Sequence, residues 1–253
     1  MKKNKPLTSI IMPAYDVTDI SRALTRAALF LIFKYTDEAD YELLFMDTIP
    51  PGSKEHSLFD TYNVLQLGER EDRQWIKLYC DKEENPGPYA MYNRGAKLAR
   101  GDYLCFIHTD ILVEDNWLKN LRYYLDGGHC SAVMPDQRNH CREDILYYQQ
   151  ADYLDSRVLN ETLREAGLIM MTRKAFEDVG GWPEDIRIYY GEKVMYPRLT
   201  GTKNKLICTA KCQIHHVAMV NYKSRVANDY DNLLNDKNIS GAAIKEYDEG
   251  RRK

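Results

Sequence analysis

The sequence predicts an α/β protein built on a doubly wound, mostly parallel sheet. Three short apolar runs each lead to an acidic residue: residues 9–12 to Asp16, 43–46 to Asp47, and 103–107 to Asp110. Continuous apolar runs of this length are typical of strands buried on both faces of a parallel sheet. Because ligands bind beyond the carboxyl ends of such strands, the acids predict a polar site there.

Helical patterns alternate with these strands, as in consecutive β-α-β units. Helices are predicted over residues 17–35, 89–99 and 117–125, and further strands over 75–80 and 130–134. The second half is less regular, and residues 136–165 show no clear period. There we expect a strand at 168–171, a helix at 173–179 and an extended segment at 206–215.

Composition excludes several classes of protein. The chain has 253 residues, 44% of them hydrophobic, and a formal net charge of -3, so charge gives no support for nucleic-acid binding. No apolar stretch reaches the roughly 18 residues needed to span a bilayer. The basic N-terminus leads into a strand and not into a signal-peptide core, which predicts a cytoplasmic protein.

The six cysteines do not indicate a disulfide framework in a chain of this length without a secretion signal. Cys208, Cys212, His215 and His216 offer four zinc ligands, but their spacing matches no common zinc module. On an extended strand the two adjacent histidines also point to opposite faces, so we do not favour structural zinc.

Short motifs follow one another along roughly residues 8–218, at 9–16, 45–48, 85–87, 93–95, 99–104, 108–110, 179–184, 191–192 and 215–216. In their order and spacing these motifs resemble those of the family 2 glycosyltransferases of the GT-A fold. This resemblance implies a GT-A-type nucleotide-diphospho-sugar transferase, with a nucleotide-binding half at 1–112 and an acceptor and catalytic half at 113–220. Residues 221–253 are expected to form a charged tail.

The resemblance also implies a divalent cation, Mn²⁺ or Mg²⁺, because the diphosphate of the donor must leave as an anion. Asp110 would be the direct ligand, and His215 could add a nitrogen ligand, with His216 as the alternative. His108 and Thr109 would lie close to the ribose and phosphates. The competing interpretation makes Asp110 an ordinary turn aspartate.

Donor contacts are expected at the strand ends. Tyr15 could stack on the nucleobase, with the backbone of Pro13 and Ala14 at its edge, and Asp47 could bind the nucleobase or ribose of a UDP-sugar. Gly87 allows close approach of the backbone to the donor, and the helix N-terminus that follows can offer N–H groups to phosphate. Asn93 either fixes the loop beside the donor or is a surface residue of the helix.

Glu192 is the predicted general base, since the acceptor hydroxyl must lose its proton as it attacks the anomeric carbon. The competing interpretation makes it a solvated residue in the first turn of a helix, beside Gly191. One base opposite the leaving group predicts inversion at that carbon. Trp182 could stack on an acceptor sugar or form a wedge in the core. Glu184 and Asp185 could bind acceptor hydroxyls or simply be solvated.

A catalytically degenerate relative that only binds nucleotide or glycan is the alternative function. Thr48, His108 and Lys193 motivate it, because the family usually has acids at these positions. A nucleotidyltransferase would need a glycine-rich basic loop after the first strand, where Pro13 to Asp16 stand instead. The sequence leaves the acceptor and the oligomeric state open.

Overall fold

The computed structural model describes residues 8–15, 19–36, 41–47, 75–79, 86–137, 167–186, 191–201 and 206–217. Within these ranges one sheet runs in the order β3-β2-β1-β4-β7-β6-β8-β5. Its strands are β1 (Thr8–Ala14), β2 (Tyr41–Asp47), β3 (Trp75–Tyr79), β4 (Tyr103–Ile107), β5 (Ile111–Val113), β6 (Ala132–Gln137), β7 (Leu168–Thr172) and β8 (Leu206–His216). The helices are α1 (Asp19–Tyr35), α3 (Pro88–Leu98), α4 (Trp117–Asp126), α6 (Arg173–Asp178) and α7 (Gly191–Gly201).

The sheet has a parallel half and a mixed half. Strands β3, β2, β1 and β4 are parallel neighbours. Strand β7 is antiparallel to both β4 and β6, whereas β8 is parallel to β6 and antiparallel to β5. The mostly parallel α/β sheet and its less regular second half are therefore confirmed. Strand β5 is an addition that the sequence did not predict, and α7 was considered only in the competing interpretation of Glu192.

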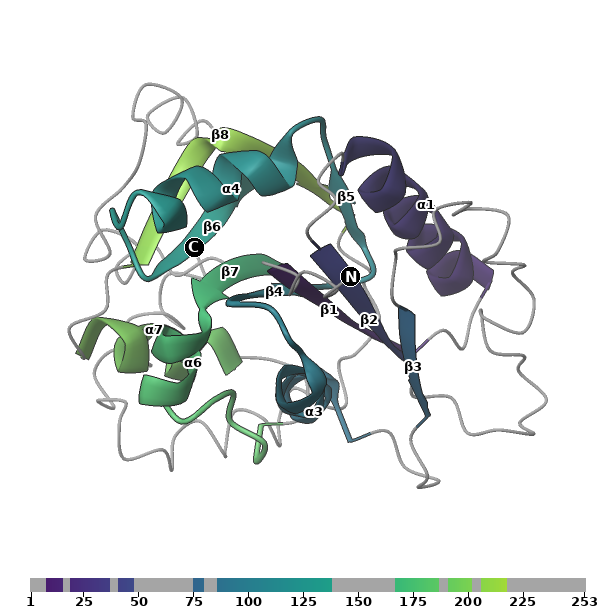
Figure 1. Ribbon diagram of the computed structural model, residues 1–253. Coiled ribbons are helices and arrows are strands. Elements are labelled where there is room, and N and C mark those ends of the chain that lie inside the picture. Colours follow the sequence, from purple (N-terminus) through teal and green to yellow (C-terminus); the bar gives the residue numbers. More distant parts are fainter. Residues whose placement is uncertain are drawn as a thin grey trace, which may run out of the picture.

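Helices cover both faces of the sheet, as expected of a doubly wound fold (Figure 1). Successive side chains of a strand point to opposite faces of the sheet, so alternate residues lie in two separate hydrophobic cores. Ile10 belongs to the same buried hydrophobic cluster as Ile32 of α1 and Trp117 of α4. Its neighbour Ile11 packs with Tyr92 of α3 and with buried residues of α6 and α7.

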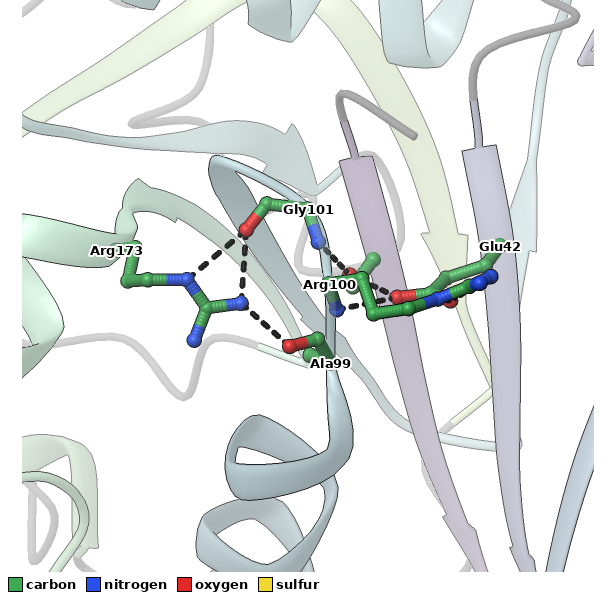
Figure 2. A network of polar contacts seen from close by, with 6 residues as sticks. Glu42, Ala99, Arg100, Gly101 and Arg173 are labelled. Atoms are coloured by element: carbon green, nitrogen blue, oxygen red, sulfur yellow. Dashed lines mark hydrogen bonds and ion pairs between the residues drawn. The ribbon is translucent and has the colours of Figure 1, made fainter. Parts of the chain in front are cut away.

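A polar network joins the elements at the start of the parallel strands (Figure 2). Glu42, 1% exposed, accepts hydrogen bonds from the Ser9 hydroxyl at 2.7 Å and from the backbone N–H of Arg100 at 2.6 Å. The Arg100 guanidinium completes the ion pair at 2.8 Å. Three donors and a paired charge satisfy this carboxylate, so its burial is compatible with a stable fold.

Arg173 ties the end of α3 to the start of α6. Its guanidinium donates to the carbonyls of Ala99 and Gly101 at 2.8 Å each (Figure 2). It also donates to the carbonyl of Ala96 at 3.3 Å. These are carbonyls at and beyond the C-terminus of α3, where a cation is favourable to the helix dipole. The network thus fixes the position of α3 in the fold.

Asp16, Thr48 and the predicted tail 221–253 lie outside the described residues, as do two of the six cysteines, Cys80 and Cys141. The described cysteines, Cys105, Cys130, Cys208 and Cys212, are free thiols. Burial raises the pKa of the Cys105 thiol well above its ordinary value. None of the helices in the described ranges is both long and apolar enough to cross a membrane.

Candidate active site

The parallel strands bring the predicted donor residues to one edge of the sheet. In the register of β1 and β2, Ala14 lies beside Asp47, and both are the last residues of their strands. The next parallel strand, β4, ends at Ile107 and is followed directly by His108, Thr109 and Asp110. Because parallel strands end at the same edge, these segments are neighbours there.

Three side chains at this edge form a candidate metal centre. One ligand atom each from His108, Asp110 and His216 lies within 4.8 Å of the other two. The His216 Nε2 is 3.4 Å from Asp110 Oδ2, and the two imidazole centroids are 6.1 Å apart. Pairing of β5 with β8 sets Ile111 opposite His216, which carries that histidine to Asp110.

The structure places His216, and not the predicted His215, beside Asp110. Adjacent residues of a strand point to opposite faces, so only one of the two histidines can reach the centre. His215 lies on the other side, with its Nε2 2.9 Å from Glu114 Oε1. In the described part of the chain, the His108–Asp110–His216 group is the one cluster of potential ligands, so Cys208 and Cys212 do not join the histidines in a zinc site.

Asp110 is held as a carboxylate by its two histidines. Burial alone would raise its pKa, but the hydrogen bond from His216 and the charges of His108 and His216 outweigh burial and leave the pKa below its ordinary value. Its side chain is 18% exposed, so it is still reached from solvent. A partly accessible anion flanked by imidazoles is suited to binding a divalent cation.

Glu192 is a buried acid at the start of α7, only 8% exposed. Its Oε2 accepts a hydrogen bond from the Tyr89 hydroxyl at 2.9 Å. The Tyr92 phenol, one helical turn further along α3, has its pKa raised by burial, by Cys105, and then by both Asp110 and Glu192. The two candidate acids therefore lie within electrostatic range of the same side chain.

Asn93 holds the turn after α6 and is not a surface residue. Its Nδ2 donates to the Trp182 carbonyl at 2.8 Å and to Glu184 Oε1 at 2.9 Å, while its Oδ1 accepts from the Trp182 N–H at 2.9 Å. The sequence predicted that Asn93 fixes the loop beside the donor; the loop that its amide fixes is this turn, at Trp182 and Glu184. Gly181 supports the turn with a φ of 80°, which a side chain would strain.

Trp182 is part of the core, which corrects the predicted stacking on an acceptor sugar. The residue is 4% exposed, and its ring stacks on Tyr89 at 5.3 Å between centroids. Tyr92 and Phe106 lie against it at 5.4 and 5.5 Å. Glu184 and Asp185, in contrast, are exposed on the same turn and can contact a ligand.

The other residues of the predicted donor site lie at the end of β1, before α3 and after β4. Ala14 is buried, whereas Pro13 and Tyr15 are half-buried at the end of β1. Gly87 precedes α3 with a φ of 88°, a conformation that favours glycine. Thr109 is half-buried between the two candidate ligands His108 and Asp110.

Sequence reasoning missed Tyr89 and Tyr92, which line α3 between the two candidate acids. No motif marks them, since a buried tyrosine on a helix is usually a core residue. Tyr92 lies nearly parallel to the His108 ring, at 12° and 6.3 Å between centroids, so it also contacts the candidate metal centre.

Solved structures of GT-A glycosyltransferases align with this chain. The mannosyltransferase PcManGT from Pyrobaculum calidifontis, in complex with GDP-Man and Mn²⁺, aligns with a TM-score of 0.65 and 15% identity over 96% of this chain and 69% of its own. S. aureus TarS in complex with UDP-GlcNAc aligns with a TM-score of 0.63 and 14% identity over 94% of this chain and 69% of its own. At these identities the likeness establishes the fold, and the chain has the GT-A architecture.

The chain belongs to glycosyl transferase family 2, whose model matches residues 9–198. It is also 29% identical, over 123 residues, to an uncharacterized glycosyltransferase of Haemophilus influenzae. That alignment covers 48% of this chain and 44% of the Haemophilus protein, so it spans less than half of either.

Proposed function

We propose that this protein is a metal-dependent, inverting glycosyltransferase that moves a sugar from a nucleotide-diphosphate sugar to an acceptor hydroxyl. The observation that carries the proposal is the group of His108, Asp110 and His216 at the end of β4. Buried Glu192 is bonded to Tyr89, whose ring lies 6.5 Å from that of Tyr92, and Tyr92 lies 6.3 Å from the His108 ring; these contacts support one shared site for metal and base. The relatives named above supply the family context.

The three side chains fit a divalent cation. One carboxylate oxygen and two imidazole nitrogens are a mixed donor set that Mn²⁺ accepts better than Mg²⁺, which prefers oxygen ligands. When bound, the cation would neutralise charge that develops on the departing diphosphate. We therefore propose Mn²⁺ as the preferred ion, with Asp110 and His216 as ligands and His108 as the third donor.

The chain's own residues would bind and orient the donor. Tyr15, with the backbone of Pro13 and Ala14, would contact the nucleobase, and Asp47 the nucleobase or ribose. We propose uridine as the base; complexes of the structural relatives contain UDP-GlcNAc in one case and GDP-Man in another. The turn at Gly87 and the N-terminus of α3 would approach the phosphates.

Glu192 would take the proton of the acceptor hydroxyl as that oxygen attacks the anomeric carbon. The sugar–phosphate bond breaks on the opposite side, so the configuration inverts. Exposed Glu184 and Asp185 would bind acceptor hydroxyls, while Trp182 supports their turn from the core. Glu192 is 8% exposed and accepts a hydrogen bond from the Tyr89 hydroxyl, so the proposed base lies mostly inside the protein.

The second candidate function is binding of nucleotide or glycan without turnover. It is favoured by the replacement of frequent family acids at Thr48, His108 and Lys193. The two candidates differ in one measurable way. A binder would hold a nucleotide equally well with and without metal and would release no nucleoside diphosphate.

The test combines a thermal-shift screen of UDP- and GDP-sugars, with and without Mn²⁺, with an assay for released nucleoside diphosphate. A donor at 100 times its Kd should stabilise the fold by about 2.7 kcal/mol. Glu192→Gln should keep donor binding and lose roughly 100-fold or more of the turnover. Glu177→Gln, on the exposed face of α6, is the matched control and should keep full turnover. Full turnover in Glu192→Gln would refute the base assignment.

A further inference from the structure

The Tyr89 hydroxyl forms a bridge between the backbone and the carboxylate at the start of α7. It accepts a hydrogen bond from the Gly191 N–H at 3.0 Å and donates one to Glu192 Oε2 at 2.9 Å. We infer that Tyr89 is a positioning residue that fixes the orientation and the charge of Glu192. The inference rests on the proposed role of Glu192 and goes beyond it, because no motif assigns a function to Tyr89.

The direction of the Tyr89 proton follows from the two contacts. A phenol has one O–H donor, and an amide N–H can only donate. The Gly191 N–H therefore occupies an acceptor site on the phenol oxygen, and the phenol proton is directed to Glu192. Glu192 in turn must accept, which it does best as a carboxylate.

Tyr89 is held rigidly in this position. It is 3% exposed, and its ring stacks on Trp182 with an angle of 20° between the planes. Gly191 has no side chain, and a Cβ built there would overlap the Tyr89 ring. The phenol thus packs directly on the backbone that carries Glu192, and neither group can rotate away without disturbing the core.

The bridge also connects two parts of the proposed site. Tyr89 is in the first turn of α3, directly after Gly87 and Pro88 on the proposed donor side. Glu192 is in the first turn of α7, on the proposed acceptor side. A hydrogen bond between these turns sets the base relative to the donor, and small errors in such placement reduce rates strongly.

The chemical effect is to stabilise the charged form of Glu192. A hydrogen bond donated to a carboxylate favours its ionised state. Tyr89 itself stays protonated, because burial and then the charge of Glu192 raise its pKa well above the ordinary value. The neighbouring Tyr92 acts on Tyr89 in the same direction. Tyr89 therefore holds Glu192 ready to receive the acceptor proton and takes no proton itself.

The experiment compares Tyr89→Phe with the wild type by ¹³C NMR of carboxyl-labelled glutamate. The Glu192 signal is assigned by its absence in Glu192→Gln. We expect the midpoint of this carboxyl titration to move to higher pH by about one unit in Tyr89→Phe. Tyr123→Phe, which changes an exposed tyrosine of α4, should leave the midpoint unchanged. An unmoved midpoint in a folded Tyr89→Phe protein would overturn the inference.

Turnover of the donor found in the screen gives the second readout. Tyr89→Phe should lose at least tenfold in kcat with donor Kd unchanged, and the acidic limb of its rate profile should move with the NMR midpoint. Full kcat in Tyr89→Phe, together with an inactive Glu192→Gln, would overturn the positioning role alone. An active Glu192→Gln would overturn the base assignment and, with it, the role of Tyr89.

Discussion

The Asn93 side chain and the Trp182 backbone form a reciprocal pair of hydrogen bonds, 2.8 Å from Nδ2 to the carbonyl and 2.9 Å from the N–H to Oδ1. This pair joins α3 to the turn after α6. Asn93 is 8% exposed and also donates to Glu184. Because the site is buried, water would not take over these hydrogen bonds if the amide were lost.

Asn93→Asp should destabilise the fold. The substitution removes the donor to Trp182 and sets a second carboxylate beside Glu184, at a cost of about 2–3 kcal/mol. Urea unfolding followed by circular dichroism measures the loss. Asn120→Asp is the control, because its amide donates to the Lys211 carbonyl at the surface and should cost less than about 1 kcal/mol. Equal losses of unfolding free energy in the two variants would show that the buried pair of hydrogen bonds contributes no more than the surface one.

The two adjacent histidines of β8 should differ in metal binding. His216 lies beside Asp110, so His216→Ala should weaken Mn²⁺ binding by tenfold or more in calorimetry. His215 pairs with Glu114 on the other side of the strand, so His215→Ala should change the Mn²⁺ Kd by less than threefold. The opposite order of effects would contradict the placement of the centre.

Arg173→Lys should cost about 1–3 kcal/mol of unfolding free energy. The planar guanidinium serves the carbonyls of Ala96, Ala99 and Gly101, and an ammonium cannot reproduce that geometry. Lys174→Ala, at the next residue, removes only an exposed ion pair with Asp178 and should cost roughly 0.5 kcal/mol or less. Chemical denaturation of the two variants in parallel compares them. An unchanged unfolding free energy in Arg173→Lys would mean that other contacts hold the end of α3 in place.

Ionisation of Tyr103 should lower the free energy of unfolding at alkaline pH. Burial first, then the hydrogen bond to Asp126 at 2.6 Å and the charge of Asp126, raise its pKa to about 12. An unfolded tyrosine titrates near about 10. The folded state therefore holds this proton more tightly, and the stability it contributes is complete below about pH 10 and is lost as pH rises towards about 12.

Tyr103→Phe removes the ionisable group and with it this pH-dependent contribution to stability. The unfolding free energy of the variant should therefore fall less steeply than that of the wild type over roughly pH 10 to 12. The other tyrosines titrate in both proteins and cancel in the comparison. Urea unfolding at a series of pH values gives the two slopes, and absorbance of tyrosinate follows the titration directly. Identical slopes would show that the Asp126 contact does not persist in solution.

The parallel half of the fold was predictable because its strands are buried on both faces and read as continuous apolar runs, as in residues 103–107. Strand β5, only Ile111–Val113, is too short to give a periodic signal, and its pairing with β8 depends on a segment far along the chain. Helix α7 has Pro197 in its interior, which argues against a helix when only the sequence is known.

The site was predictable as a set of strand-end acids, but not in the choice between His215 and His216. A signal was present in the sequence. Cys212 and Ile214 are buried and alternate along β8, so His216 continues their inward face and His215 does not. The roles of Tyr89 and Asn93 had no such signal, since they depend on packing between α3 and segments roughly a hundred residues later.

The proposed metal centre joins residues 108 and 110 to residue 216. During synthesis, His108 and Asp110 leave the ribosome long before the strand that carries His216. A nascent chain that ends before β8 lacks the third ligand and the partner of β5. Capacity to bind the ion would therefore arise only when translation of this region is nearly complete.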